Sequence, residues 1–440
     1  MSDHRESPAL QRAVPGIRSE PGTTADAGLR PESRPKAVAG DRRQARRESG
    51  TAAGVSRRGI LYGGAAAVAG AVATAGRATP AQAGSVADGT AVEAFHGPHQ
   101  AGIATSPQAH AVFLGLDLRR GADRDSVSRM MRLLTDDARR LTQGRPALAD
   151  TEPELAALPA RLTVTFGFGP GLFAAVGGKA PVEDLPGFKI DKLEDRWSGG
   201  DLLVQICADD PLTVAHALRM IVKDARSFAD VRWTQRGFRR AAHTQRPGLT
   251  QRNVMGQLDG TVNPAPGTPD FERAVWITGG GPLHGGTTLV LRRIRAELES
   301  WDAADVVAKE FTVGRRLATG APLTGRQEHD EPDFARLGTS GLPMISEYAH
   351  IRRARVEDPG MRIFRRVYNY DEGVSERGTA DSGLLFASYQ ADIDRQFVPV
   401  QRRLAEADLL NEWTIPIGSA VFAVPPGCGP DGWIGQTLLA

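Results

Sequence analysis

The sequence contains few of the features that cross-link a small protein or hold it in a membrane. Cys207 and Cys428 are the two cysteines among 440 residues, which excludes a disulfide framework, and their spacing matches no zinc or iron–sulfur motif. A single bridge between them stays open, but we interpret both as buried thiols. The weakly apolar stretch at residues 62–74 is too short to span a bilayer, so we expect no stable membrane anchor.

The chain also lacks a strong excess of charge of one sign. Its formal net charge is +2, with +6 in residues 1–83 and −4 in the remainder. A remainder of that charge has no general attraction for nucleic acid, so we expect no nucleic-acid partner. With 41% apolar and 24% charged residues, the composition is that of a soluble globular protein long enough for one or two hydrophobic cores.

The first 83 residues resemble a targeting sequence. Residues 1–55 are rich in Arg, Pro, Gly, Ser and Ala and show little apolar periodicity, which predicts a disordered leader. Within residues 56–83, the pair Arg57-Arg58 precedes the apolar stretch, and Ala81-Gln82-Ala83 supplies the small residues of a cleavage site.

This layout is typical of a twin-arginine signal peptide. The alternative, an Ala-rich buried helix or a membrane anchor, fits less well because the apolar stretch is short and ends near the charged Arg77. We therefore predict that the twin-arginine export machinery carries the folded chain to the periplasm, the cell envelope or the medium.

The remaining chain reads as two halves of similar plan. In residues 84–245, period-2 and helical apolar patterns alternate in the order β-α-β-β-α-β, which is the ferredoxin-like unit. The predicted strands are 111–118, 161–168, 201–208 and 231–238, and the helices are 125–141 and 211–228.

Residues 246–440 repeat this plan with longer insertions. The predicted strands are 287–294, 362–370, 383–389 and 419–424, and a helix is predicted over 392–407. The fold class is therefore α+β, with two ferredoxin-like halves whose antiparallel sheets enclose a pocket.

Three segments of the second half carry candidate chemistry. His350 is one of nine histidines, and a single histidine is more often structural than a ligand. Asp259 stands in Gly256-Gln257-Leu258-Asp259-Gly260, where a plain turn is the simpler interpretation. Arg365 and Arg366 begin the basic, aromatic segment 365–370, which alone would be an edge strand. Each signal is weak by itself, but their joint occurrence is informative.

Taken together, these segments resemble dye-decolourising haem peroxidases. The elements follow one another in the family's order, and the resemblance extends from about residue 94 to the end, closest to the exported branch that includes deferrochelatases. The segments that carry it are Gly256–Gly260, "AHIR" at 349–352, "FRRVYNY" at 364–370 and "GLLFASYQADI" at 383–393.

The resemblance implies one haem b per chain with His350 as the proximal iron ligand. Asp392 is our candidate for the carboxylate that binds the other imidazole nitrogen. Asp259 would be the distal acid–base group. Arg365, with Arg366 as the alternative, would stabilise charge on the departing oxygen of peroxide.

Gly260, Thr261 and Val262, together with Arg365, are expected to line the haem. The implied activity is reduction of hydrogen peroxide with oxidation of dyes, phenols or other small organic donors. The alternative is a deferrochelatase that releases iron from haem and leaves the porphyrin intact. Bulky donors cannot enter a buried haem pocket, so their electrons would pass through surface aromatic residues, to none of which we assign this role. A homo-oligomer stays open.

Overall fold

The computed structural model describes residues 89–439, with gaps at 243, 247 and 377. The predicted leader (1–55) and the predicted signal peptide (56–83) lie outside the described residues. In the described part of the chain, no helix is both long enough and apolar enough to cross a membrane.

The first half forms an antiparallel sheet with the strand order β2-β3-β1-β4. One helix connects β1 to β2 and another connects β3 to β4, so the order along the chain is the predicted β-α-β-β-α-β. The elements are β1 (His110–Leu118), α1 (Arg124–Thr142), β2 (Thr163–Phe168), β3 (Leu202–Ala208), α3 (Pro211–Ala225) and β4 (Ala229–Phe238).

The second half repeats this sheet with the order β7-β8-β5-β9. Its first crossover carries several helices and its second carries one, so the ferredoxin-like plan is confirmed in both halves. The elements are β5 (Thr287–Ala296), α5 (Leu298–Ala303), α6 (Val306–Val313), α7 (His350–Arg353), β6 (Phe364–Arg365), β7 (Tyr368–Val374), β8 (Ala380–Gln390), α8 (Val398–Ala407) and β9 (Thr414–Val424).

The connections hold shorter elements. Helical segments are α2 (Pro170–Ala175), α4 (Pro269–Val275) and α9 (Gln436–Leu439), the 3-10 turns Pro153–Ala156, Asp195–Trp197, Pro359–Met361 and Leu409–Glu412, and a π turn at Ile393–Phe397.

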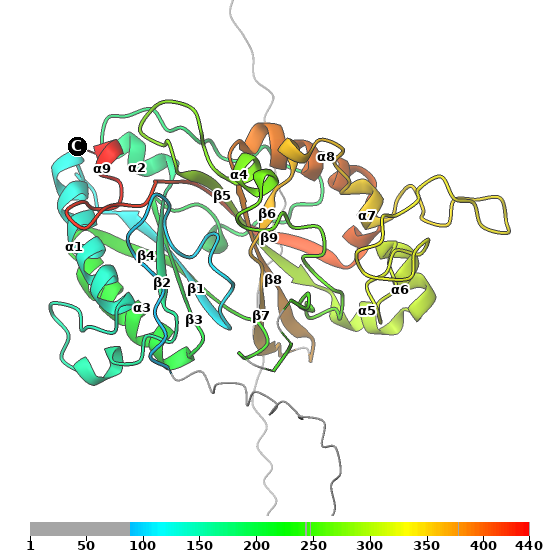
Figure 1. The fold of residues 1–440 in the computed structure, drawn as a ribbon, viewed down its shortest axis with the longest axis horizontal. Coiled ribbons are helices and arrows are strands. Elements are labelled where there is room, and N and C mark those ends of the chain that lie inside the picture. Colours follow the sequence, from blue (N-terminus) through cyan, green and yellow to red (C-terminus); the bar gives the residue numbers. More distant parts are fainter. Residues whose placement is uncertain (1–88, 243, 247, 377, 440) are drawn as a thin grey trace, which may run out of the picture. The chain divides into compact units, whose positions relative to one another are not determined.

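The two sheets join at their edges. Phe168 of β2 pairs with Ala423 of β9, and Phe238 of β4 pairs with Asn369 of β7. Because β5 also pairs with β8, the nine-stranded sheet closes on itself. In Figure 1 the strands lie between α1 and α3 on one side and α5 to α8 on the other.

Two hydrophobic clusters account for this arrangement. One packs the apolar faces of α1 and α3 against the first sheet, with Met130, Leu134 and Ile221 fully buried. The other fills the space between the two sheets with aromatic side chains, among them Phe113 and Tyr389. Burial of side chains of this size is the main favourable term in folding.

Local sequence explains where the two main helices of the first half begin. Asp123 accepts a hydrogen bond from the Ser126 amide, and the Ser126 hydroxyl accepts one from the Asp123 amide, both at 2.9 Å. This reciprocal pair is a capping box. At α3, Asp210 accepts a hydrogen bond from the Thr213 amide, and Pro211 occupies the first helical position.

Three sequence-based expectations need correction. The strand predicted over 362–370 is interrupted at Arg366 and Val367. The helix predicted over 392–407 starts with the π turn before α8, since Asp392 caps that turn by accepting a hydrogen bond from the Arg395 amide. Both cysteines are free thiols, but Cys428 is only partly buried.

Candidate active site

His350 lies at the start of α7, with its imidazole held by a carboxylate. Nδ1 of His350 is 2.6 Å from Oδ2 of Asp408, whose side chain is 3% exposed. The other carboxylate oxygen of Asp408 accepts a hydrogen bond from the Leu410 amide at 2.9 Å. Asp408 is therefore fixed from both sides, and it fixes the ring of His350.

This geometry corrects the partner predicted for His350. We expected Asp392, but its side chain caps the turn before α8. Asp408 follows the other end of α8 and holds the imidazole. The prediction that a carboxylate holds the imidazole is confirmed, but the predicted residue was wrong, since Asp408 and not Asp392 makes this contact.

The environment of His350 leaves one ring nitrogen available. Burial alone would lower the pKa of His350, but the adjacent Asp408 carboxylate outweighs burial and raises it. Nε2 forms no hydrogen bond with any described residue, and 29% of the side chain is exposed. The imidazole is thus oriented on one side and open on the other.

Asp259 stands at the end of a short loop whose backbone favours glycine at two positions. Its amide donates to the Gln251 carbonyl at 2.9 Å, which closes the turn. Gly256 and Gly260 have φ values of +81° and +128°, a region that favours glycine. The turn exposes little of the carboxylate, whose side chain is 9% exposed.

Arg365 lies directly against Asp259. Its Nη1 is 3.1 Å from Oδ1 of Asp259, which is buried and accepts no hydrogen bond of good geometry from the described residues. Asn263 holds the two segments together: its side chain donates to the Arg365 carbonyl at 2.7 Å and accepts from the Arg365 amide at 3.1 Å.

Arg366, the alternative to Arg365, points elsewhere. Its side chain is fully buried and donates to the Thr105 carbonyl and to Oε1 of Gln108. The break between β6 and β7 lets these neighbouring arginines face different environments. The structure brings Arg365, and not Arg366, to Asp259.

The three candidate groups act on one another electrostatically. Apart from burial and Asp408, the charges that shift the pKa of His350 are those of Arg365, which lowers it, and Asp259, which raises it. Such influence requires proximity in a poorly solvated region. Asp259 and Arg365 therefore lie within electrostatic range of His350, although the three residues are not adjacent in sequence.

The residues predicted to line the cofactor follow Asp259 along the same turn. Val262 is 61% exposed. The Thr261 hydroxyl donates to Oε1 of Glu328 at 2.9 Å, and Thr250 donates to the same oxygen. Glu328 thus anchors the segment that carries Gly260, Thr261 and Val262.

These observations fit a haem. A haem needs an accessible imidazole nitrogen and apolar surface, and its distal side needs polar groups that peroxide can reach. His350 has a nitrogen without a hydrogen bond to a described residue, Val262 has exposed apolar surface, and Oδ1 of Asp259 is a buried acceptor paired only with Arg365 among the described residues.

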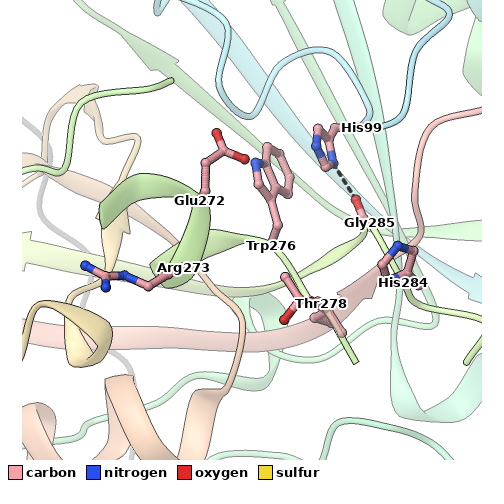
Figure 2. A pocket seen from close by; sticks show the side chains of 8 residues that line it. His99, Glu272, Arg273, Trp276, Thr278, His284 and Gly285 are labelled. Atoms are coloured by element: carbon pink, nitrogen blue, oxygen red, sulfur yellow. Dashed lines mark hydrogen bonds between the residues drawn. The ribbon is translucent and has the colours of Figure 1, made fainter. Parts of the chain in front are cut away.

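A half-open pocket of about 280 Å³ lies at a different place (Figure 2). None of the three candidate groups borders it, so it is separate from the site above. We call it the His99–Trp276 pocket; it is lined by His99, Glu272, Arg273, Trp276, Ile277, Thr278, His284 and Gly285.

Sequence reasoning missed the residues that position the site. Asp408, Asn263 and Glu328 hold His350, Arg365 and Thr261 respectively. An aspartate just before a helical turn, as Asp408 stands before Leu409–Glu412, is a common capping residue, so only its contact with His350 distinguishes it. Asn263 stands close to Asp259 in sequence, which could have drawn attention to it.

Comparison with known proteins shows the family of the chain. The N-terminal Dyp-type peroxidase domain matches residues 100–239, and the C-terminal Dyp-type peroxidase domain matches residues 250–429. A dye-decolorizing peroxidase of Thermobifida fusca is 41% identical over 359 residues, which cover 77% of this chain and 83% of the relative. A deferrochelatase of Escherichia coli K12 is 34% identical over 370 residues, covering 78% and 86%.

Solved structures lead to the same family. The crystal structure of a DyP-type peroxidase from Cellulomonas bogoriensis is 51% identical, with a TM-score of 0.77, and the match covers 80% of this chain and 99% of that one. The chain described here belongs to the Dyp-type peroxidase family.

Proposed function

We propose that this chain reduces hydrogen peroxide at a haem held by His350 and oxidises dyes, phenols or similar organic donors. The chain is a haem peroxidase by family. The observation that carries the assignment of residues is that Asp259 and Arg365 pair with each other and lie within electrostatic range of His350.

Haem supplies an iron that binds peroxide and stores the oxidising equivalents released when the O–O bond breaks. Nε2 of His350 would bind that iron. Asp408 accepts the Nδ1 proton in a hydrogen bond, which selects the required tautomer and makes the ring a stronger ligand.

Asp259 and Arg365 divide the work on the peroxide side. Oδ1 of Asp259 pairs only with Arg365 among the described residues, and the carboxylate would accept a proton from one peroxide oxygen and return it to the other. The guanidinium of Arg365 stabilises negative charge on the oxygen that leaves. Asn263 bonds to the backbone of Arg365 and so holds the Arg365 segment next to the loop that carries Asp259.

The test uses purified protein loaded with haem. We expect an absorption band near 400 nm, as for ferric haem bound to histidine, and a rapid spectral change when peroxide is mixed in. A protein that stays colourless after haem loading would overturn the proposal. So would a haem protein whose spectrum and turnover do not respond to peroxide.

The alternative function is the release of iron from haem, since a curated relative carries the name deferrochelatase. Asp259 and Arg365 favour the peroxidase, because removing iron requires no group that moves a peroxide proton. Incubating the haem protein without peroxide separates the two. Accumulation of iron-free porphyrin would favour the alternative, and an unchanged haem spectrum would favour the peroxidase.

We also propose export by the twin-arginine pathway, on the basis of Arg57 and Arg58 and the apolar stretch after them. Replacing both arginines with lysine in the full chain should leave the longer precursor in the cytoplasm. Unchanged processing and export of that variant would contradict the proposal.

A further inference from the structure

The His99–Trp276 pocket contains a histidine with a defined tautomer. Nδ1 of His99 is 2.6 Å from the carbonyl oxygen of Gly285, and a carbonyl can only accept, so Nδ1 carries the proton. In the neutral ring, Nε2 is then a proton acceptor, and it forms no hydrogen bond with a described residue. Figure 2 shows the bond that orients this ring.

The same histidine stacks on Trp276. The two rings are 3.8 Å apart between centroids and inclined by 6°. Trp276 is 5% exposed, so its indole is mostly covered by protein while it still borders the cavity. A proton acceptor and an oxidisable indole therefore stand in contact at one cavity.

A series of aromatic contacts leads from Trp276 toward the candidate active site. Trp276 lies 5.8 Å from Phe271, and Phe271 lies 5.0 Å from Phe364, in both cases edge to face. Phe364 directly precedes Arg365 in β6. These rings form a continuous packed path for an electron between the pocket and the segment that carries Arg365.

We propose that the His99–Trp276 pocket binds a small phenol as electron donor, with His99 taking its proton and Trp276 its electron. The proposal rests on the peroxidase function, which supplies the oxidant. A cavity of about 280 Å³ suits a single substituted ring rather than a large dye.

The charges around the pocket also favour a neutral donor. Arg273 is largely exposed and pairs with Asp270 at 2.5 Å, and the neighbouring Glu272 carries the opposite charge. Glu272 lines the pocket and forms no ion pair with a described residue, so the pocket repels an anionic donor. Nε2 of His99 favours a donor with an O–H group, whose proton it can accept.

The proposed step is the one-electron oxidation of the phenol. The phenol O–H bond breaks, its proton moves to Nε2 of His99 and then to solvent, and one electron passes through Trp276 to the haem oxidised by peroxide. The phenoxyl radical leaves, and two phenols are consumed for each peroxide reduced to water. Phe271 and Phe364 are not oxidised; the electron tunnels across them.

Binding is tested first, on the haem-loaded protein without peroxide. Fluorine NMR titration with para-fluorophenol should show saturable binding, weakened about tenfold by His99→Asn and by Trp276→Phe, the loss expected for one aromatic or hydrogen-bonding contact. Asparagine can still donate to Gly285 but offers no ring and no Nε2. Binding that is unchanged in both variants would overturn the proposal.

Each variant has a matched control. His96 also points Nδ1 at a backbone carbonyl, that of Cys428 at 3.3 Å, and Trp433 is 6% exposed in a different cluster. His96→Asn and Trp433→Phe should bind the phenol as the unaltered chain does. Equal weakening in the controls would also count against the pocket.

Turnover then separates this inference from the proposed function. With peroxide present, Trp276→Phe should slow phenol oxidation about tenfold and leave the first reaction with peroxide at its original rate. If the unaltered chain does not react with peroxide, the proposed peroxidase function is wrong. Whether the pocket binds a phenol is still decided by the NMR titration. Normal phenol oxidation by both variants would overturn the pocket alone.

Discussion

Each half of the chain contains a histidine bonded to an aspartate, but the two histidines differ in how much of the side chain is exposed. In the first half, Nε2 of His216 lies 3.2 Å from Oδ1 of Asp150, and the two side chains are 2% and 0% exposed. In the second half, His350 is bonded to Asp408 at 2.6 Å yet stays 29% exposed. Because the His350 side chain is the more exposed of the two, we propose that it, and not His216, binds the iron.

The difference follows from the insertions in a shared plan. The connection from β1 to β2 in the first half carries α1, which packs on the sheet. The equivalent connection from β5 to β6 carries α5, α6 and α7, and His350 starts α7. The sheets supply a rigid frame, and the longer insertion supplies His350, while Asp259 precedes β5 and Arg365 lies in β6.

The strongest test of this comparison is His350→Ala. We expect the variant to fold but to lose its haem, because no other described side chain of the site offers a free imidazole nitrogen. The measurement is the ratio of haem absorbance to protein absorbance after loading. A variant that keeps a normal haem spectrum would show that another residue binds the iron.

Replacing Asp259 with Asn or Arg365 with Leu should keep the haem and slow the reaction with peroxide. Each change removes one preorganised group, and the expected loss is about a hundredfold. Stopped-flow mixing with peroxide measures this rate. Native rates in both variants would remove Asp259 and Arg365 from the mechanism.

Asp408→Asn tests the correction made by the structure. The amide cannot stabilise the imidazole as the carboxylate does, so haem affinity should fall about 10- to 100-fold. Asp392→Asn is the control and should leave haem affinity unchanged, because its side chain only caps a turn. Competition for haem with a second haem-binding protein measures both, and the reverse result would restore Asp392.

His216→Ala should affect stability and leave haem binding alone. Removing a buried histidine leaves Asp150 without its partner and should lower the free energy of unfolding by about 2 kcal/mol. Denaturant unfolding measures the loss. If His216→Ala retained less haem at unchanged stability, the expectation that only the His350 pair binds haem would be wrong.

The smallest expected effect concerns Asp224, whose partner is another acid. Burial and the neighbouring Asp137 raise its pKa from 3.8 to about 8. Ionisation therefore disfavours the folded state, and the free energy of unfolding should fall as pH rises from about 4 to 8.

Asp224→Asn should remove this dependence and stabilise the chain at pH 8 by roughly 1–2 kcal/mol, a value discounted because the carboxyl group is partly exposed. Thermal unfolding at pH 5 and pH 8 measures it. An identical pH dependence in the variant would exclude Asp224 as the titrating group.

The order of strands and helices could be read from the sequence because apolar periodicity is local. The buried, mostly apolar run of β3 and the helical spacing of apolar residues along α1 depend on neighbouring residues alone. Asp259, Arg365 and His350 could be named because short motifs surround them.

The tertiary structure decided which of these residues meet. Asp392 and Asp408 flank the same helix, and only packing shows that the end at Asp408 faces His350. The same holds for His99 and Trp276, which are distant in sequence and stacked in space. Local pattern determines the elements, but contacts between distant residues depend on how the sheets close and the insertions pack.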